Sequence, residues 1–251
     1  MALGEPTDEL TAQAYVSTLY PKRYSGTGFL YHSRVVTDML HDLTFRDGRH
    51  SDKVLDVGCG IGFVSQLYPN FDIVGMDISD EMLKRNPHNW VKAPAEAIPF
   101  PDNHFDVVLC RSLLHHLDVP AKGMAEMARV LKPGGKFVCW EPNLSPFNDW
   151  IRKLSKLTKR FSHWHKNFSP KELVQIITNS GLTITHKKYH GHLAYATLGF
   201  PDILDLHIPL WIGRKLIKLD DIISKTPLDV MGWAVMITAI KDKNVSKTFN
   251  Y

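Results

Sequence analysis

The chain has 251 residues, of which 44% are hydrophobic and 22% charged, and its formal net charge is +4. This length can bury a sizeable core as one α/β domain, and the charge alone is too mild to indicate a nucleic-acid binder. The three cysteines Cys59, Cys110 and Cys139 form no CxxC pair. We therefore expect a reducing compartment, with neither a disulfide framework nor a structural zinc site.

The N-terminal stretch MALGEPTDEL has no basic region followed by an apolar one, so we expect no signal peptide. Ala2 stands where N-myristoylation requires glycine. The longest apolar run, from Val230 to Ile240, falls short of the ~20 residues that a membrane-spanning helix needs. A cytoplasmic location is the expectation.

Helical patterns fill the first fifty residues, and YPKRYSGTG divides them into two pieces. Short apolar strands then alternate with helical segments, which is typical of a parallel sheet with both faces covered. The expected strands are KVLDVG, DIVGMD, FDVVLC, KFVCWE, LTITHKKY and GWAVMITAIK; the expected helices include AKGMAEMARVL, ended by KPGG at 132–135, and SPKELVQIITNSG, which starts at Ser169-Pro170 and stops at Gly181.

The pattern divides the chain into a central core and covering segments. Some forty residues separate the last two expected strands, far more than a tight turn requires. The expected units are an N-terminal helical cover at 1–50, a core at 51–189 with a basic helical segment at 144–166, an insert at 190–229, a last core strand at 230–241 and a tail at 242–251.

The stretch VLDVGCGIGFVSQL joins an expected strand to an expected helix through three glycines, an arrangement that grips anionic cofactors. A P-loop would close with Gly-Lys-Ser/Thr, which is absent. A dinucleotide fingerprint starting at Gly58 would need Gly or Ala at position 63, where Phe63 stands. Asp77 ends the next expected strand, at the offset where an acid meets a ribose hydroxyl. That acid suits NAD and S-adenosylmethionine equally.

The later stretches AEAIPFPDNHFDVVLCRSLLHHL and EMARVLKPGGKF, following DVGCGIG in order, resemble the class I S-adenosylmethionine-dependent methyltransferases. The closest likeness is to the small-molecule branch that includes the ubiquinone/menaquinone C-methyltransferases. The resemblance covers roughly residues 50–185. It implies a Rossmann-like, seven-stranded, mostly parallel sheet with helices on both faces, N-terminal helices and a helical lid. The implied cofactor is S-adenosyl-L-methionine.

The resemblance also implies roles for single residues. Asp56 would lie near the amino group of the cofactor, Asp77 would accept hydrogen bonds from both ribose hydroxyls, and Ile78 would lie against the adenine. Pro94 departs from the family, which often has an acid there, so Glu96 or a backbone carbonyl must meet the adenine amine. The full cofactor set is Asp56, Gly58, Cys59, Gly60, Gly62, Asp77, Ile78, Ala95, Glu96, Cys110 and Arg111.

Each assignment has a structural alternative. Asp77 could cap the helix that begins near Ser79, and the cysteines could be ordinary buried thiols. Glu96 could support its loop.

Methyl transfer needs positioning, and a base where the acceptor gives up a proton. His116, after the fourth expected strand, and Glu141, at the end of the fifth, are the candidate bases, although either could instead hold the local backbone. His163 and His165 lack a third ligand, so no metal is expected. Candidate acceptor contacts are Tyr24, Tyr31, His165 and Trp211.

The segments WIRKLSKLTKRFSHWHK and IPLWIGRKLIKL mix aromatic, aliphatic and basic residues. They could form a lid over a hydrophobic acceptor, with the apolar residues of the lid, including Trp211, facing inward and its basic face exposed to solvent. Alternatively, they could form a surface that binds anionic lipid reversibly. The leading hypothesis is a methyltransferase for a small, fairly hydrophobic acceptor: a lipid, glycolipid, quinone-like ring or secondary metabolite. The alternatives are a non-catalytic cofactor-binding module or subunit, an RNA methyltransferase and, more distantly, a dehydrogenase; a nucleic-acid partner is not favoured, and the oligomeric state stays open.

Overall fold

The computed structural model describes residues 18, 20–41, 52–144, 168–199 and 207–243. Its centre is one seven-stranded sheet with the order β3-β2-β1-β4-β5-β7-β6. Every neighbouring pair is parallel except the two that involve β7, which runs antiparallel to both β5 and β6. The strands are β1 Lys53–Val57, β2 Asp72–Asp77, β3 Trp90–Lys92, β4 Phe105–Arg111, β5 Leu131–Pro142, β6 Leu182–His190 and β7 Ala234–Lys241.

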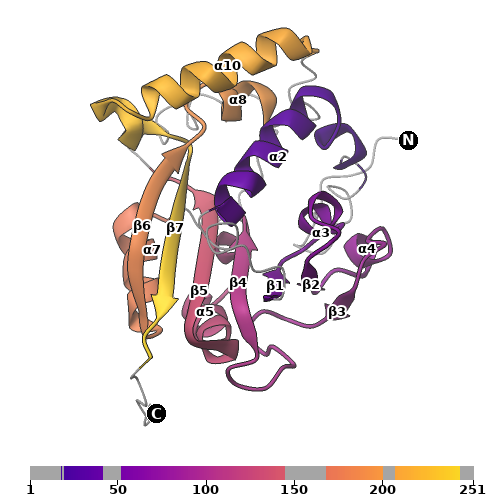
Figure 1. Cartoon of the computed structure of the whole chain (residues 1–251), viewed down its shortest axis with the longest axis vertical. Coiled ribbons are helices and arrows are strands. Elements are labelled where there is room, and N and C mark those ends of the chain that lie inside the picture. The colour runs from indigo at the N-terminus through magenta and orange to yellow at the C-terminus, as the bar shows by residue number, and fades with distance from the viewer. Residues whose placement is uncertain (1–17, 19, 42–51, 145–167, 200–206, 244–251) are drawn as a thin grey trace.

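Successive residues of the central strands point to opposite faces and enter two separate cores. On β1, Val54 joins one cluster and Leu55 the other, and Leu109 and Cys110 divide in the same way on β4. The first core is covered by α5 (Pro120–Val130) and α7 (Pro170–Asn179); the second by α2 (Gly26–His41), α3 (Phe63–Leu67) and α8 (Ala194–Leu198). The sheet therefore has helices on both faces, as the resemblance implied (Figure 1).

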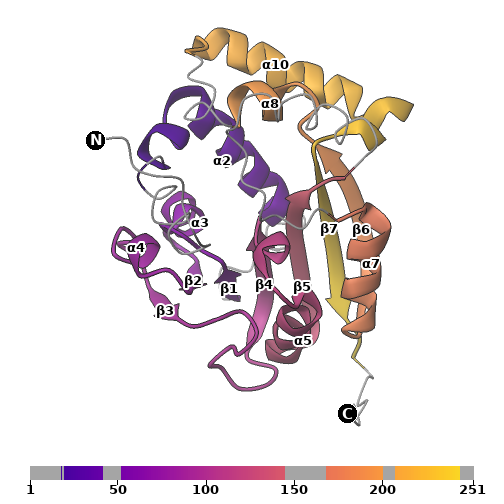
Figure 2. The ribbon, with the colours of Figure 1, turned by 180° about the vertical axis from the view of Figure 1, so that it is seen from behind.

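The carboxyl ends of the parallel strands lie at one edge of the sheet, and α2 and the insert cover that edge on the β5–β6 side (Figures 1 and 2). The insert contains α8, α10 (Leu210–Ile223) and a 3₁₀ turn η4 (Pro227–Met231). Helix α10 packs against both α2 and α8. The N-terminal helix and the insert thus form one continuous cover.

Several helix and strand boundaries expected from the sequence are confirmed, and others differ in the structure. Helix α7 starts with Ser169 and Glu172 in a reciprocal capping box and Pro170 at its first turn, which confirms the expected start. The N-terminal helices break at Tyr24-Ser25, inside YPKRYSGTG.

Two expected boundaries were misplaced. Strand β5 already begins at Leu131, so KPGG lies within it. The last strand begins at Ala234 and not at residue 230, because a 3₁₀ turn occupies Pro227–Met231. Most of the basic segment 144–166, and of the tail, lies outside the described residues.

Candidate functional site

The glycine turn follows β1 and has a backbone that only glycine adopts easily. Gly58, Gly60 and Gly62 have φ of 76°, 53° and 79°, in the left-handed region. The turn is fixed to β2, since Gly58 N donates to Met76 O at 2.7 Å and Gly60 N donates to Asp77 Oδ2 at 2.9 Å. The turn therefore presents backbone at the carboxyl edge with no Cβ in the way.

Asp77 ends β2 beside this turn. Its second oxygen, Oδ1, accepts a hydrogen bond from Ser79 N at 2.9 Å. Burial raises the pKa of the carboxyl, while the hydrogen bonds from Ser79 and Gly60 oppose that shift. Ser79, not Asp77, caps the short helix α4 (Asp80–Leu83), with its side chain accepting from Met82 N. The helix-cap alternative for Asp77 is thus set aside, and its remaining lone pairs can accept from hydroxyl groups.

Asp56 is a buried carboxyl group on β1, 2% exposed, and it accepts no hydrogen bond from the described residues. Burial raises its pKa to about 7, with Arg111 lowering it and Asp77 raising it further. A buried carboxyl group without a hydrogen-bond partner is costly unless a cation or donor meets it. The cofactor of the resembled class carries an ammonium group of that kind, so the residues present fit it.

Arg111 ends β4 within a buried aromatic cluster. Its Nη2 donates to Tyr24 Oη at 2.7 Å, and its Nη1 lies 3.3 Å from His32 Nδ1. His32 Nε2 lies 2.9 Å from Gly199 O, so it donates there and leaves Nδ1 to accept from Arg111. Burial, together with the Arg111 charge, holds the pKa of His32 well below its usual value. Tyr24 stacks on Phe63, with ring centroids 4.1 Å apart.

This cluster links three distant segments: the N-terminal cover, the end of β4 and the insert. Tyr20 extends it to the glycine turn, because a Cβ on Gly60 would meet the Tyr20 ring at 3.6 Å. Burial raises the pKa of Tyr20 to about 12. His32 was not among the predicted site residues. Its position on a helix face gave no signal, since its partners are contributed by β4 and the insert.

Glu141 is fully buried near the end of β5 and is committed to backbone support. One oxygen accepts from Leu113 N and Leu114 N, each at 2.9 Å, and the other lies 2.7 Å from His115 Nδ1. The supported turn, η2 (Leu114–His116), follows β4, and Leu113 packs on the glycine turn at the space that a Cβ of Gly58 would occupy. This arrangement makes Glu141 a positioning residue. The His116 ring lies against that of His115, with centroids 4.1 Å apart and the planes tilted by 38°, and it is close enough to lower the pKa of Asp77.

The other predicted cofactor residues differ in how they could make contact. Ile78, 46% exposed, leaves an apolar side chain open beside Asp77, and Glu96 is half-buried. The Cys59 thiol is held by Asn86 Nδ2 at 3.6 Å, and burial raises its pKa. Ala95 and Cys110 lie in the core. Because Cys110 is fully buried there, its thiol is an ordinary core group.

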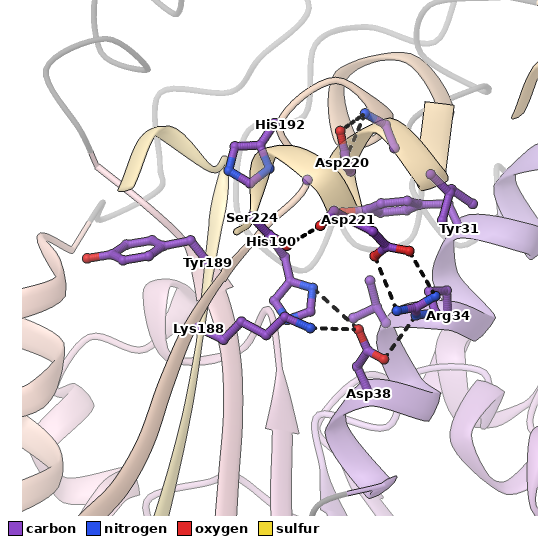
Figure 3. A pocket seen from close by; sticks show the side chains of 14 residues that line it. Tyr31, Arg34, Asp38, Lys188, Tyr189, His190, His192, Asp220, Asp221 and Ser224 are labelled. Carbon is purple, nitrogen blue, oxygen red and sulfur yellow. Dashed lines mark hydrogen bonds and ion pairs between the residues drawn. The ribbon is translucent and has the colours of Figure 1, made fainter. Parts of the chain in front are cut away.

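A small pocket, of about 30 Å³, lies where α2, the end of β6 and α10 meet. Arg34 on α2 reaches both Asp38 (2.9 Å) and Asp221 of α10 (3.2 Å), and Asp38 also faces Lys188 and His190 of β6 (Figure 3). The ion pairs of Arg34 and Lys188 join the insert to the N-terminal helix and the sheet, whereas burial lowers the pKa of His190 to about 4 and leaves its ring neutral.

Of the predicted acceptor contacts, Tyr24 lies in the Arg111 cluster, whereas Tyr31 is buried under the cover and lines this pocket. Trp211 was expected to face inward; it is 61% exposed on the outer side of α10, with Lys215 Nζ 5.0 Å from its ring centroid. Because the ring is exposed on the outer side, the expected inward contact is wrong for this structure. His165 lies outside the described residues.

Metal sites and membrane-spanning helices can be considered for the residues that the structure describes. No group of three or more His, Cys, Asp or Glu in that part of the chain could hold a metal ion. Among the same residues, no helix is both long and apolar enough to cross a bilayer.

The chain is similar to known methyltransferases in sequence and in fold. Residues 55–139 match the family model described as "Methyltransferase domain". The chain is 42% identical over 105 residues to a demethylmenaquinone methyltransferase of Renibacterium salmoninarum, covering 38% of this chain and 44% of that protein. It is 33% identical over 133 residues to a ubiquinone/menaquinone biosynthesis C-methyltransferase of a Shewanella species, covering 47% and 53%. The chain thus spans about half the length of these relatives.

Among solved structures, the chain resembles magnesium protoporphyrin IX methyltransferase from Synechocystis with bound SAH (S-adenosylhomocysteine). The TM-score is 0.63 at 14% identity, and the match covers 94% of this chain and 100% of that one. A likeness at this identity shows that the two proteins share a fold. Residues 55–139 thus match a methyltransferase domain, and the fold is similar to that of the class I S-adenosylmethionine-dependent methyltransferases. Within that class, the chain is similar to the quinone C-methyltransferases.

Proposed function

We propose that this protein transfers a methyl group from S-adenosylmethionine to a small, fairly hydrophobic acceptor. The observation that carries the proposal is the convergence, inside the matched methyltransferase domain, of the glycine turn with two acids. Asp56 is buried and lacks a hydrogen-bond partner among the described residues, and Asp77 keeps lone pairs beside an open apolar residue, Ile78. Such a set suits a ligand that carries an ammonium group, a ribose and an adenine.

The residues divide the work of holding the cofactor. Asp56 binds the ammonium, Asp77 the ribose hydroxyls, and Ile78 packs on the adenine, with Glu96 near its edge. Arg111 is a half-buried cation whose hydrogen-bond partners in the described chain, Tyr24 and His32, are neutral, and it supplies the counter-charge for the methionine carboxylate. When bound, S-adenosylmethionine supplies an electrophilic methyl group. The protein contributes orientation and exclusion of water.

His116 is the base candidate that the geometry favours where the acceptor must lose a proton. It is the last residue of the turn that Glu141 fixes, and it lies close enough to Asp77 to lower the pKa of that carboxyl group. Glu141 acts through that turn. Its carboxylate already accepts two backbone hydrogen bonds and contacts His115, so it is poorly placed to take a proton from an acceptor.

The acceptor class is inferred from two supports. The relatives named above act, by their names, on demethylmenaquinone or in ubiquinone/menaquinone biosynthesis. The cover over the carboxyl edge is also rich in aromatic side chains, among them Tyr24, Tyr31 and Tyr195. A lipid, glycolipid, quinone-like ring or secondary metabolite fits these supports. We place the protein in the cytoplasm, with access to such acceptors by reversible contact with a membrane.

The test is incubation with S-adenosylmethionine labelled in its methyl group and a cell extract divided into lipid, metabolite and RNA fractions. We expect S-adenosylhomocysteine to form and the label to enter the lipid or metabolite fraction. Asp77→Ala should abolish incorporation, whereas Asp72→Ala, at the exposed start of the same strand, should leave it intact. Binding without turnover would instead support a non-catalytic module, and label in RNA would contradict a small acceptor.

A further inference from the structure

The outward side of α10 combines large apolar side chains with cations. Trp211 and Ile222 are each 61% exposed, and Leu219 is 41% exposed. Along α10, positions 211, 215, 218 and 222 recur at helical spacing and so form one stripe. The following turn η4 adds Leu228 and Val230, each 56% exposed. Scattered exposed apolar residues are normal, but several of them on one helix and on the turn that contacts it indicate an interaction surface.

The fully exposed charges on this surface are positive; Asp229 of η4 is partly buried, with its Oδ1 3.7 Å from His192 Nε2. The exposed cations of the surface are Arg214, Lys215, Lys218 and Lys225, and none of them forms an ion pair with a described residue.

The two acids of α10 are both committed elsewhere. Asp220 is buried and accepts from Leu193 N and Ala194 N, while Asp221 pairs with Arg34 of α2. The structure thus leaves the cations of this face unneutralised by neighbouring carboxylates.

We propose that the exposed face of α10 and η4 docks on the surface of an anionic lipid bilayer. An interfacial helix of this kind buries its apolar side chains at the headgroup boundary, while Lys and Arg meet the phosphates. A protein partner fits less well, because interface cores are depleted in lysine. RNA fits less well too, since exposed Leu and Ile have no partner on a phosphate backbone.

The docking surface lies on the cover, not on the cofactor site. Helix α10 is tied to α2 by Arg34 and Asp221, and α2 carries His32, which contacts Arg111. Contact with lipid therefore brings the cover of the carboxyl edge to the bilayer. The proposal rests on the proposed function only for the role of the docking, which is to give a hydrophobic acceptor a short path from the membrane to the site.

The test is co-sedimentation with phosphatidylcholine vesicles that contain or lack phosphatidylserine. The variant is Lys215→Glu with Lys218→Glu. The matched control, Lys122→Glu with Lys171→Glu, makes the same change of net charge on exposed positions of α5 and α7. Since each basic residue near an anionic surface contributes about 1 kcal/mol, the α10 variant should bind at least about 10-fold more weakly, and the control should bind like wild type.

Three outcomes would overturn the proposal: wild type that ignores anionic vesicles, an α10 variant that still binds them, or a control that loses binding equally. Sedimentation velocity without vesicles gives a further check, because self-association that the α10 variant abolishes would place a second copy on this face. Calorimetry of S-adenosylhomocysteine binding separates the docking proposal from the proposed function. The affinity for S-adenosylhomocysteine should be unchanged in both variants, whatever the vesicle experiments show.

Discussion

The two ends of the carboxyl edge of the sheet are built by different means. At β1 and β2, the glycine turn and Asp77 lie within about 25 residues of sequence and are joined by backbone hydrogen bonds. At β6, the cover is held by side chains far apart in the chain, such as Arg34 and Asp221, which are 187 positions apart. The first end is set by local backbone geometry and the second by long-range pairing. Substitutions should therefore act strongly and locally at the first end, and weakly at the second.

The largest effect should come from Asp77→Ala. Loss of a charged acceptor facing the ribose should weaken S-adenosylhomocysteine binding by about 10- to 100-fold, as expected for one or two charge-assisted hydrogen bonds. Isothermal titration calorimetry measures the change, with Asp72→Ala as the control on the same strand. Equal affinity of the two variants for S-adenosylhomocysteine would show that Asp77 does not bind the ribose.

Next should be Gly62→Ala, which we expect to lower the free energy of unfolding by about 2 kcal/mol. Its φ is positive, and a Cβ there would overlap the Asn86 side chain, which also holds His88 N. Gly26→Ala is the control: its φ is positive too, but a Cβ would meet no atom within 4 Å, so only backbone strain of about 1 kcal/mol is expected. Urea unfolding measures the loss of stability in the two variants. Equal losses would show that the Asn86 side chain can move aside with no loss of free energy.

A smaller effect concerns pH. The pKa of Asp56 is about 7 in the folded protein, against an ordinary value of 3.8, so this group favours the native state at low pH and that contribution is lost as pH rises through 7. Cofactor binding should behave oppositely, because the ammonium needs the ionised form. Affinity for S-adenosylhomocysteine should therefore rise up to about tenfold per pH unit below pH 7 and level off above it. Calorimetry across this range should find a flatter profile in Asp56→Asn; the same slope in that variant would assign the proton to another group.

The smallest effect should be at the cover. The Arg34–Asp221 pair is half-exposed, with side chains 43% accessible on both partners, so a double-mutant cycle with Arg34→Gln and Asp221→Asn should give a coupling below about 1 kcal/mol. Denaturant unfolding of the four proteins measures it. A coupling above about 2 kcal/mol would mean that the insert is fixed as firmly as the glycine turn.

The same contrast explains how far the sequence could predict the molecule. Six strands and the glycine turn could be located because apolar runs and positive-φ glycines are local signals. The short strand β3 gave no such signal, and its exposed Trp90 hides the pattern.

The site was harder to predict where the residues that contact each other are far apart in the sequence. The backbone role of Glu141 depends on β4 and β5 being neighbours, and His32 depends on contacts with Arg111 and Gly199. The orientation of Trp211 was missed because α10 carries apolar residues on both sides, with Leu216 and Ile217 packed inward.

The position of β7 has a consequence for how the chain folds. The last strand along the sequence is not at the edge of the sheet but between β5 and β6, pairing with both over most of its length. Until residues 234–241 have been synthesised, β6 has no partner in the sheet and the flank of β5 is open. During synthesis the half of the sheet that carries the glycine turn can close first, while β6 stays an unpaired strand with a tendency to aggregate. Completion of the sheet thus depends on the eight residues of β7, which follow every other described strand in the sequence.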